Sequence, residues 1–225
     1  MRVDGKVVLI AGGSGALGGT VVPAFLAAGA RAVTADRSPS TDHADGRLAL
    51  RADVTDEADV RRLVDEVSRT VGRIDVLVNL VGGFAPGRVE TTDLALWQRM
   101  LTTNLTAAFL LSKTLLPHMK ERGTGRLVHV AAWAAVKPFP GAAAYIVAKS
   151  GLLGLINVLA LELNGSGVTV NAVLPTTIDT PANRAGMPGV DPATWARPAS
   201  IAETLLFLAS DEANQINGAT VPIGA

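Results

Sequence analysis

The chain of 225 residues contains no cysteine. This absence excludes disulfides, thiolate metal sites and cysteine nucleophiles together. Histidine is scarce, and the three histidines, His43, His118 and His129, are too scattered to suggest a set of metal ligands. The sequence therefore predicts no metal centre.

Neither sign of charge is in excess, because lysine plus arginine and aspartate plus glutamate each total 20, and no basic run occurs. This balance argues against nucleic acid or an anionic membrane as a partner. No segment approaches the roughly 20 apolar residues of a membrane span. The first residues, MRVDGKVVLIAGG, contain too short an apolar run for a signal peptide. With 48% hydrophobic residues the chain can bury a large core, and we expect a soluble, cytoplasmic protein.

Short β-branched runs alternate with longer segments of helical apolar spacing along the whole chain. Runs such as KVVLIAG and DVLVNLV are almost continuously apolar, as strands covered on both faces must be. The alternation predicts an α/β fold: a Rossmann-like, doubly wound, seven-stranded parallel sheet with helices on both faces. The predicted strands are Val7–Ala11, Arg31–Asp36, Leu48–Ala52, Val76–Leu80, Arg126–Ala131, Thr169–Leu174 and Ala219–Ile223. The predicted helices are Ala16–Ala28, Asp56–Val71, Asp93–Arg122, Ala143–Leu163 and Ser200–Ala209.

No repeat, low-complexity segment or linker divides the sequence, so we predict a single domain over residues 1–225. Its cofactor half spans about residues 1–90, and its catalytic half spans about residues 91–225. One irregular segment, residues 175–198, is rich in proline, glycine, asparagine and aspartate. A long loop in a compact domain usually has a function, so we interpret it as a lid; a plain surface excursion is the alternative.

A glycine-rich turn follows the first predicted strand. Gly13, Gly15 and Gly18 in AGGSGALGGT match the G-x-G-x-x-G pattern, and a helix opens within it. Glycines allow a tight turn and let the backbone approach a pyrophosphate at the N-terminus of a helix. The motif alone is weak, since glycine also serves ordinary turns. Its position after a strand and before a helix makes a dinucleotide site the favoured interpretation.

Two acidic residues follow the next strands. Asp36 ends the second strand, 18 residues after Gly18, where a carboxylate accepts hydrogen bonds from an adenosine ribose. A carboxylate there repels a 2′-phosphate, so NADH is favoured, while the neighbouring Arg37 keeps NADPH open. Asp53 could contact the adenine edge or, equally, form the turn before the helix at Asp56.

The only tyrosine of the chain, Tyr145, stands four residues before Lys149, one of five lysines. This spacing puts both side chains on one face of a helix. A nearby ammonium stabilises a phenolate, so we expect a lowered tyrosine pKa and a usable proton donor or acceptor.

These residues resemble the short-chain dehydrogenase/reductase family of the compact type over nearly the whole chain. The matching segments are AGGSGALG (11–18), DVT (53–55), DVLVNLVG (75–82), TTNLTAAF (102–109), YIVAK (145–149) and VNAVLPTTIDT (170–180). The resemblance implies three catalytic residues: Tyr145 as acid, Lys149 on the nicotinamide ribose, and Asn104 holding a bend and a water of the proton relay. It further implies NAD(P) contacts from Gly12, Gly13, Ser14, Gly15, Ala16, Leu17, Gly18, Asp36, Arg37, Asp53, Val54, Asn79, Val81, Gly82, Tyr145, Lys149, Pro175, Thr177, Ile178 and Thr180.

The chain departs from the family pattern at several positions. Ala16 replaces a glycine of the turn, NLVG stands for Asn-Asn-Ala-Gly, and Thr176 replaces a glycine after Pro175. The main departure is Ala132, thirteen residues before Tyr145, where the family places its catalytic serine. No other hydroxyl lies between Ala131 and Ala144, so the serine has not moved along the chain.

A subgroup of the family, the dihydropteridine reductases, shares this alanine, and the chain resembles it in GGSGALG and in AVLPTTIDTPANRAGMP (172–188). Such an enzyme reduces C=N, where no alkoxide develops and the serine has no task. By this resemblance Phe84, Ala132 and Trp133 face the substrate, and Phe84 stacks on a flat heterocycle; both aromatic rings could equally belong to the core. The segment VLVNLV and the C-terminal residues look like ordinary bacterial reductases of the wider family, which leaves a different substrate open.

Three hypotheses follow for function. The first is an NADH-favouring reductase without a serine. The second is a carbonyl or alcohol oxidoreductase in which Thr176, Thr177 or water supplies the missing donor. The third is a cofactor-binding sensor with little turnover. The partner in each is a small molecule, and the apolar helices Asp93–Arg122 and Ala143–Leu163 predict a homodimer or homotetramer.

Overall fold

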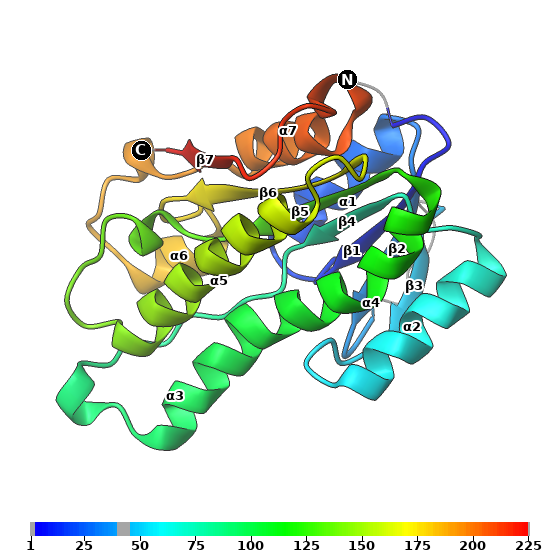
Figure 1. Ribbon diagram of the computed structural model, residues 1–225. Helices are drawn as coiled ribbons and strands as arrows, with labels where there is room; N and C mark the ends of the chain where they lie inside the picture. Colours follow the sequence, from blue (N-terminus) through cyan, green and yellow to red (C-terminus); the bar gives the residue numbers. More distant parts are fainter. Residues whose placement is uncertain (1–2, 40–45, 225) are drawn as a thin grey trace.

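The computed structural model describes residues 3–39 and 46–224 (Figure 1), so His43 lies outside the described residues. Seven parallel strands form one sheet in the order β3-β2-β1-β4-β5-β6-β7. Its strands are β1 (Val7–Ala11), β2 (Arg31–Asp36), β3 (Leu48–Arg51), β4 (Val76–Asn79), β5 (Gly125–Val130), β6 (Val168–Pro175) and β7 (Thr220–Ile223). No predicted strand end differs from the observed one by more than one residue, and the predicted seven-stranded parallel sheet is confirmed.

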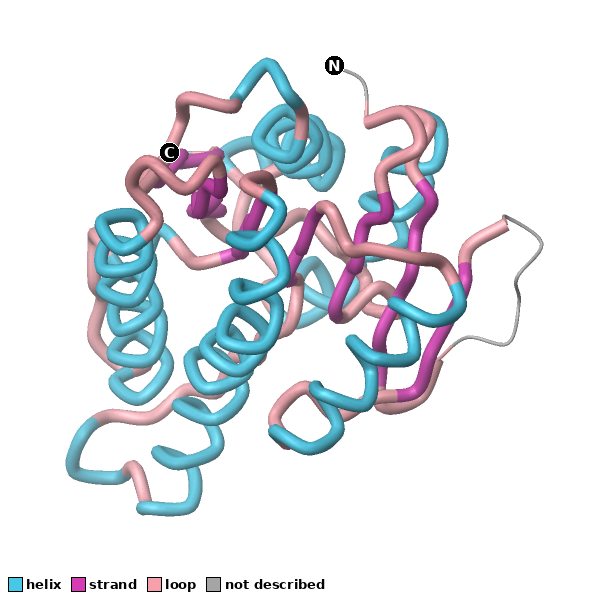
Figure 2. The backbone as a smooth tube through the Cα atoms, turned by 45° about the vertical axis from the view of Figure 1, so that its right-hand side comes forward, coloured by secondary structure: helices cyan, strands magenta, loops and turns pink. Residues whose placement is uncertain are grey.

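Helices cover both faces of the sheet (Figures 1 and 2). Helices α1 (Gly18–Ala27) and α7 (Pro198–Ala209) lie on one face, and α2 (Glu57–Thr70), α4 (Ala107–Arg122) and α5 (Ala143–Glu162) lie on the other. Two buried apolar clusters correspond to these faces, one around Phe25 and Leu205, the other around Leu63, Leu111 and Ile156. The central strands β1 and β4 are buried along their whole length because they contribute to both clusters.

The strand order reverses direction at β1. Strand β1 pairs with β2 on one side and with β4 on the other, so the connections that follow β1 and β4 depart in opposite directions. In open α/β sheets such a reversal opens a crevice at the carboxyl ends of the strands, where ligands bind. The predicted dinucleotide and catalytic segments begin at this edge.

The predicted helix Asp93–Arg122 is interrupted, which corrects the sequence analysis. Asp93 caps α3 (Leu94–Leu101) by accepting from the Leu96 amide at 2.7 Å. A π-helix, Thr102–Thr106, then precedes α4. Within the predicted lid the structure has α6 (Pro181–Gly186) and a short 3₁₀ turn, Pro192–Thr194.

Helix α5 corrects the expectation that no segment has the length and composition of a membrane span. Its 20 residues include a window of mean hydropathy 1.8, of which 39% is buried. One side of the helix packs on the sheet through Leu152 and Ile156. The Lys149 ammonium is buried in the same helix and donates to the carbonyl of Val130 at 2.8 Å. These contacts are those of a core helix with a second apolar face.

Candidate functional site

The glycine turn after β1 is packed too closely for side chains. Gly12 has φ of 84°, and its amide donates to the Ala35 carbonyl on β2 at 2.9 Å. A Cβ atom at Gly13 would lie 2.5 Å from Thr34 Cγ2, and one at Gly18 would overlap the carbonyl of Gly13. The turn therefore brings bare backbone to the start of α1, where the sequence predicts a pyrophosphate.

Asp36 lies beside this turn at the end of β2. Its Oδ1 accepts from the Ser14 amide at 3.0 Å, which joins β2 to the glycine turn. Its Oδ2 is buried and has no hydrogen-bond partner among residues 3–39 and 46–224. A buried carboxylate oxygen without a donor is costly unless a ligand supplies one, and ribose hydroxyls are such donors. The glycine turn and this oxygen together fit the adenosine half of a dinucleotide.

Asp53 takes the turn role that the sequence analysis offered as one of two alternatives. Its Oδ1 accepts from the Thr55 amide at 3.0 Å and from the Thr55 hydroxyl at 2.6 Å, and Asp56 caps α2. These hydrogen bonds from Thr55 lower the pKa of the Asp53 carboxyl, and the charge of Arg37 contributes. Arg37 is therefore close enough to act on Asp53, and both stand near Asp36. Contact with adenine stays a prediction.

Lys149, Gly82 and Asn104 meet at the carboxyl edge of β4 and β5. A Cβ atom at Gly82 would lie 3.2 Å from Lys149 Nζ and 3.0 Å from Asn104 Oδ1. Gly82 therefore lies directly against both side chains, and any larger residue there would crowd them. Burial lowers the pKa of Lys149 to about 8.

Asn104 lies in the π-helix and is buried. Its Oδ1 accepts from the Gly83 amide at 3.1 Å, and its Nδ2 donates to the carbonyls of Gly83 and Met100, each at 3.0 Å. Both polar backbone groups of Gly83 are thus held by one side chain. The predicted bend at Asn104 corresponds to this π-helix, a feature that often occurs at functional sites.

Tyr145 begins the turn of α5 that precedes Lys149, and its ring is half-buried. Burial raises the pKa of its phenol to about 12, whereas the spacing of Tyr145 and Lys149 predicts a lowered pKa. The physical reason is that the Lys149 ammonium is directed to the Val130 carbonyl and desolvation dominates at the phenol. At neutral pH the free protein therefore holds a protonated tyrosine.

Two of the three predicted substrate residues, Phe84 and Ala132, lie near Tyr145 and Lys149. Phe84 is 58% exposed and packs edge-to-face on Tyr145, with ring centroids 5.1 Å apart and an interplanar angle of 76°. Ala132 is buried two residues after the end of β5, whose last carbonyl, that of Val130, binds Lys149. Trp133 is partly buried and packs against the core cluster of α4 and α5, with Lys137 Nζ 5.4 Å from its ring centroid, which favours the core alternative; its contact with substrate stays a prediction.

The predicted lid contacts of the cofactor follow β6 in an ordered segment. Pro175 ends β6 and is buried, while the Thr177 carbonyl accepts from the Ala196 amide at 2.8 Å. Thr180 caps α6 by accepting from the Asn183 amide at 3.2 Å, and Asn183 also donates to the Ile178 carbonyl at 2.8 Å. Backbone pairing with Ala196 and one cap thus fix residues 177–180.

A buried hydrogen-bonded group behind the site joins the predicted cofactor contacts Asn79 and Val81 to His129 and Ser112, two residues that were not predicted to belong to the site. Asn79 Oδ1 accepts from the Val81 amide at 3.1 Å, and Asn79 Nδ2 lies 3.3 Å from His129 Nδ1. His129 Nε2 lies 3.3 Å from Ser112 Oγ on α4. The available signal was a histidine in the middle of the otherwise apolar strand RLVHV.

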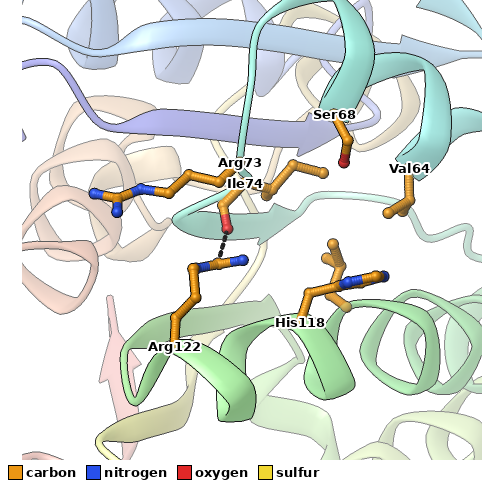
Figure 3. Close-up of a pocket in the computed structure, with 7 residues that line it drawn as sticks. Val64, Ser68, Arg73, Ile74, His118 and Arg122 are labelled. Carbon is orange, nitrogen blue, oxygen red and sulfur yellow. Dashed lines mark hydrogen bonds between the residues drawn. The ribbon is translucent and has the colours of Figure 1, made fainter.

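A separate cavity of about 220 Å³ lies between α2 and α4 (Figure 3). Ser68 and His118 face it from the two helices, and the Arg122 guanidinium beside it donates to the Ile74 carbonyl at 2.7 Å. Ile74 precedes β4, so this cavity is at the amino end of the strands. It contains none of the predicted site residues.

Comparisons with known proteins agree with this geometry. A family model described as enoyl-(acyl carrier protein) reductase matches residues 13–224. The chain is 33% identical to 2-(R)-hydroxypropyl-CoM dehydrogenase of Xanthobacter autotrophicus, with 96% of each chain covered. It is 34% identical to D-threitol dehydrogenase of Mycolicibacterium smegmatis, covering 99% of this chain and 92% of that one. A solved short-chain dehydrogenase/reductase from Serratia marcescens is 31% identical over 99% of this chain and 98% of that one, with a TM-score of 0.90.

Proposed function

Because the chain belongs to the short-chain dehydrogenase/reductase family, we propose that it transfers hydride between a nicotinamide dinucleotide and a small organic substrate, with Tyr145 as the general acid or base. The observation that carries this proposal is the meeting of Lys149 and Asn104 against Gly82. Tyr145 lies one helical turn before Lys149 in this group. The glycine turn and Asp36, which fit a dinucleotide, open on the same edge of the sheet.

Each of these side chains has a distinct proposed task. Bound NADH would supply the hydride. Lys149 would bind the nicotinamide ribose, and Asn104 would keep the Gly83 backbone in place beside it. Tyr145 is protonated at neutral pH, where its pKa of about 12 keeps the phenol neutral, so it holds a proton to give during reduction. Asp36 favours NADH over NADPH because its carboxylate would repel a 2′-phosphate.

The alanine at position 132 favours reduction of a C=N bond. Reducing C=N adds hydride to carbon and a proton to nitrogen, so no alkoxide forms that needs a second donor. In carbonyl reduction, by contrast, losing one donor to the developing oxyanion typically costs ~10²–10³ in rate. The exposed Phe84 ring beside Tyr145 adds an apolar surface suited to a flat heterocycle such as a dihydropterin.

Carbonyl or alcohol chemistry is the second candidate, and the names of the two dehydrogenase relatives favour it. It requires a substitute donor, for which Thr176, Thr177 and water are available. The Thr176 hydroxyl lies 3.3 Å from the Thr194 carbonyl and 3.4 Å from that of Gly224, so it faces the lid backbone. Thr177 or water is therefore the better substitute.

We further propose that the protein is cytoplasmic and acts as a homodimer or homotetramer paired through α4 and α5. Leu161, Val158 and Val147 on α5 are 80%, 52% and 45% exposed, and Phe109 on α4 is 45% exposed. An apolar helix face of this kind needs a second surface to cover it.

Turnover with matched acceptors tests the proposal. Oxidation of NADH and of NADPH is followed with quinonoid dihydropterin and with a panel of ketones and quinones, using wild type and Tyr145→Phe. Fast, NADH-dependent turnover of the pterin that the phenylalanine variant loses is the expected result. Good ketone turnover instead would favour the second candidate, and dinucleotide binding without turnover of any acceptor would point to a sensor.

A further inference from the structure

In the hydrogen bonds that join Ser112, His129 and Asn79 behind the site, the donor and the acceptor of each bond can be assigned. Ser112 Oγ lies 2.7 Å from the Ala108 carbonyl, to which it gives its only proton. Ser112 Oγ can therefore only accept from His129 Nε2 at 3.3 Å. Burial lowers the pKa of His129 to about 4, so the neutral ring has one proton, and that proton is on Nε2.

The other ring nitrogen is thereby an acceptor. His129 Nδ1 accepts from Asn79 Nδ2, which lies 3.3 Å away on the neighbouring strand, where the two residues are in register. This bond fixes which end of the Asn79 carboxamide faces His129. The opposite end, Oδ1, is left to accept from the Val81 amide at 3.1 Å. All three side chains are almost fully buried, so water does not offer substitute partners.

Val81 stands where the two halves of the site meet. A Cβ atom at Gly12 would lie 3.2 Å from the Val81 nitrogen, so the glycine turn rests on this peptide. The next residue, Gly82, lies against Lys149 and Asn104. A small displacement of Val81 would therefore move backbone against both the dinucleotide turn and the catalytic side chains.

We propose that His129 is a positioning residue of the dinucleotide site: as its Nε2-protonated tautomer, anchored by Ser112, it orients Asn79 so that Asn79 holds Val81. The inference rests on the proposed function, because the positioned segment is one wall of the proposed dinucleotide site. It gives a task to two residues, His129 and Ser112, that do not reach the reacting atoms.

A pair of substitutions separates the two ends of the ring. In His129→Asn the carboxamide reaches the position of Nδ1 and can still accept from Asn79, but it loses Ser112. In His129→Gln the carboxamide reaches the position of Nε2, keeps Ser112 and loses Asn79. His129→Asn removes more volume than His129→Gln, because its side chain is one methylene shorter. A cavity alone would therefore harm His129→Asn more, the opposite of the result expected from the loss of the Asn79 contact.

Two measurements are made on both variants and on wild type. The first is hydrogen exchange of the Val81 amide in the free protein; the second is the dissociation constant for NADH and for NADPH. We expect His129→Gln to exchange Val81 faster and to bind the preferred dinucleotide roughly tenfold more weakly, as for loss of one buried hydrogen bond. His129→Asn should change less in both measurements, because it keeps the acceptor for Asn79 and loses only the anchor at Ser112. Equal melting temperatures of the two variants would confirm that they are folded alike.

Equal exchange of Val81 in the two variants, or greater loss in His129→Asn, would overturn the inference. So would nitrogen chemical shifts that put the ring proton on Nδ1. Wild-type protein that binds neither dinucleotide would contradict the proposed function, while exchange of Val81 would still decide whether His129 positions this segment.

Discussion

Single side chains decide which reaction the site can perform. At Ala132 a methyl group stands where the family resemblance places a serine, and Tyr145 is the proposed proton donor. At Asp36 one carboxylate oxygen accepts from the Ser14 amide, and the other is buried without a partner in the described part of the chain. At His129 burial lowers the pKa of the imidazole and so keeps the ring neutral. Each of these three residues gives a measurable expectation.

Ala132→Ser should convert the protein toward ketone reduction. The new hydroxyl would donate to the oxygen that becomes an alkoxide, so we expect ketone turnover to rise by roughly 10²-fold. Reduction of a C=N acceptor should hardly change, because no alkoxide forms. Steady-state turnover with one ketone and one C=N acceptor measures both, and Ala134→Ser, two residues along the same turn, is the control. Ketone turnover that is high in wild type and unchanged in the variant would contradict this reading of Ala132.

Asp36→Asn should weaken NADH more than NADPH. The variant loses a charged acceptor for the ribose hydroxyls, which corresponds to roughly 10- to 100-fold in affinity. It also removes the repulsion of a 2′-phosphate, so NADPH should bind as well as before or better. Calorimetric titration with both dinucleotides measures the change. Asp53→Asn is the comparison, since the Asp53 carboxylate is already engaged by Thr55 and should matter less.

Buried His129 should make the protein lose stability in acid. Desolvation, with a smaller effect of the Lys149 charge, lowers its pKa from 6.5 to about 4 in the folded state. Between these values the unfolded chain binds more protons, so the free energy of unfolding rises with pH. The contribution is complete above about pH 6.5 and is lost as the pH falls to about 4, by up to about 3 kcal/mol. Urea denaturation across this range should show a shallower pH dependence in His129→Asn; an equal slope would disprove the assignment.

At the scale of elements, apolar periodicity located the sheet but not its irregular parts. Strands such as VVLIA are buried on both faces, so their sequences are continuously apolar and their ends are clear. The π-helix at Thr102–Thr106 leaves no such trace, because one wider turn hardly disturbs the apolar pattern of a long helix. The glycine turn and the Tyr145–Lys149 pair were recognisable from fixed spacing. The series of hydrogen bonds that joins Val81, Asn79, His129 and Ser112 could not be recognised in this way. Its members come from β4 and the loop after it, β5 and α4, which are far apart in the sequence.

The π-helix should depend on the Asn104 carboxamide. Asn104→Ala would leave the amide and carbonyl of Gly83 and the carbonyl of Met100 without their present partner. An unpaired buried group costs roughly 1–3 kcal/mol when water cannot replace the partner. Water can reach the two partly buried groups of Gly83, so the buried Met100 carbonyl accounts for most of the cost. We expect the free energy of unfolding to fall by about 2–3 kcal/mol, measured by urea denaturation. Thr103→Ala in the same turn should cost much less, and similar losses in both variants would contradict a specific role of Asn104.

For the whole molecule, the apolar surface of α5 predicts association. Leu161→Lys puts a charge on a side chain that is 80% exposed, so the single chain should fold as before while pairing of α5 with a second copy is opposed. Sedimentation velocity should show the variant at smaller mass than wild type. Val89→Lys, at a residue that is 78% exposed on the 3₁₀ turn Val89–Thr91, should leave the mass unchanged. Identical assembly of wild type and Leu161→Lys would place the interface elsewhere.

The strand order separates Asp36, the residue proposed to choose the dinucleotide, from Ala132, the residue proposed to choose the acceptor. Asp36 ends β2 and Ala132 follows β5, and two strands, β1 and β4, lie between them. Three strand spacings of about 4.8 Å put the two positions roughly 14 Å apart, and substitutions at such distances usually have additive free energies. The preferred dinucleotide and the preferred acceptor could therefore be changed independently. Wild type, a variant at Asp36, a variant at Ala132 and the double variant would then be four different catalysts.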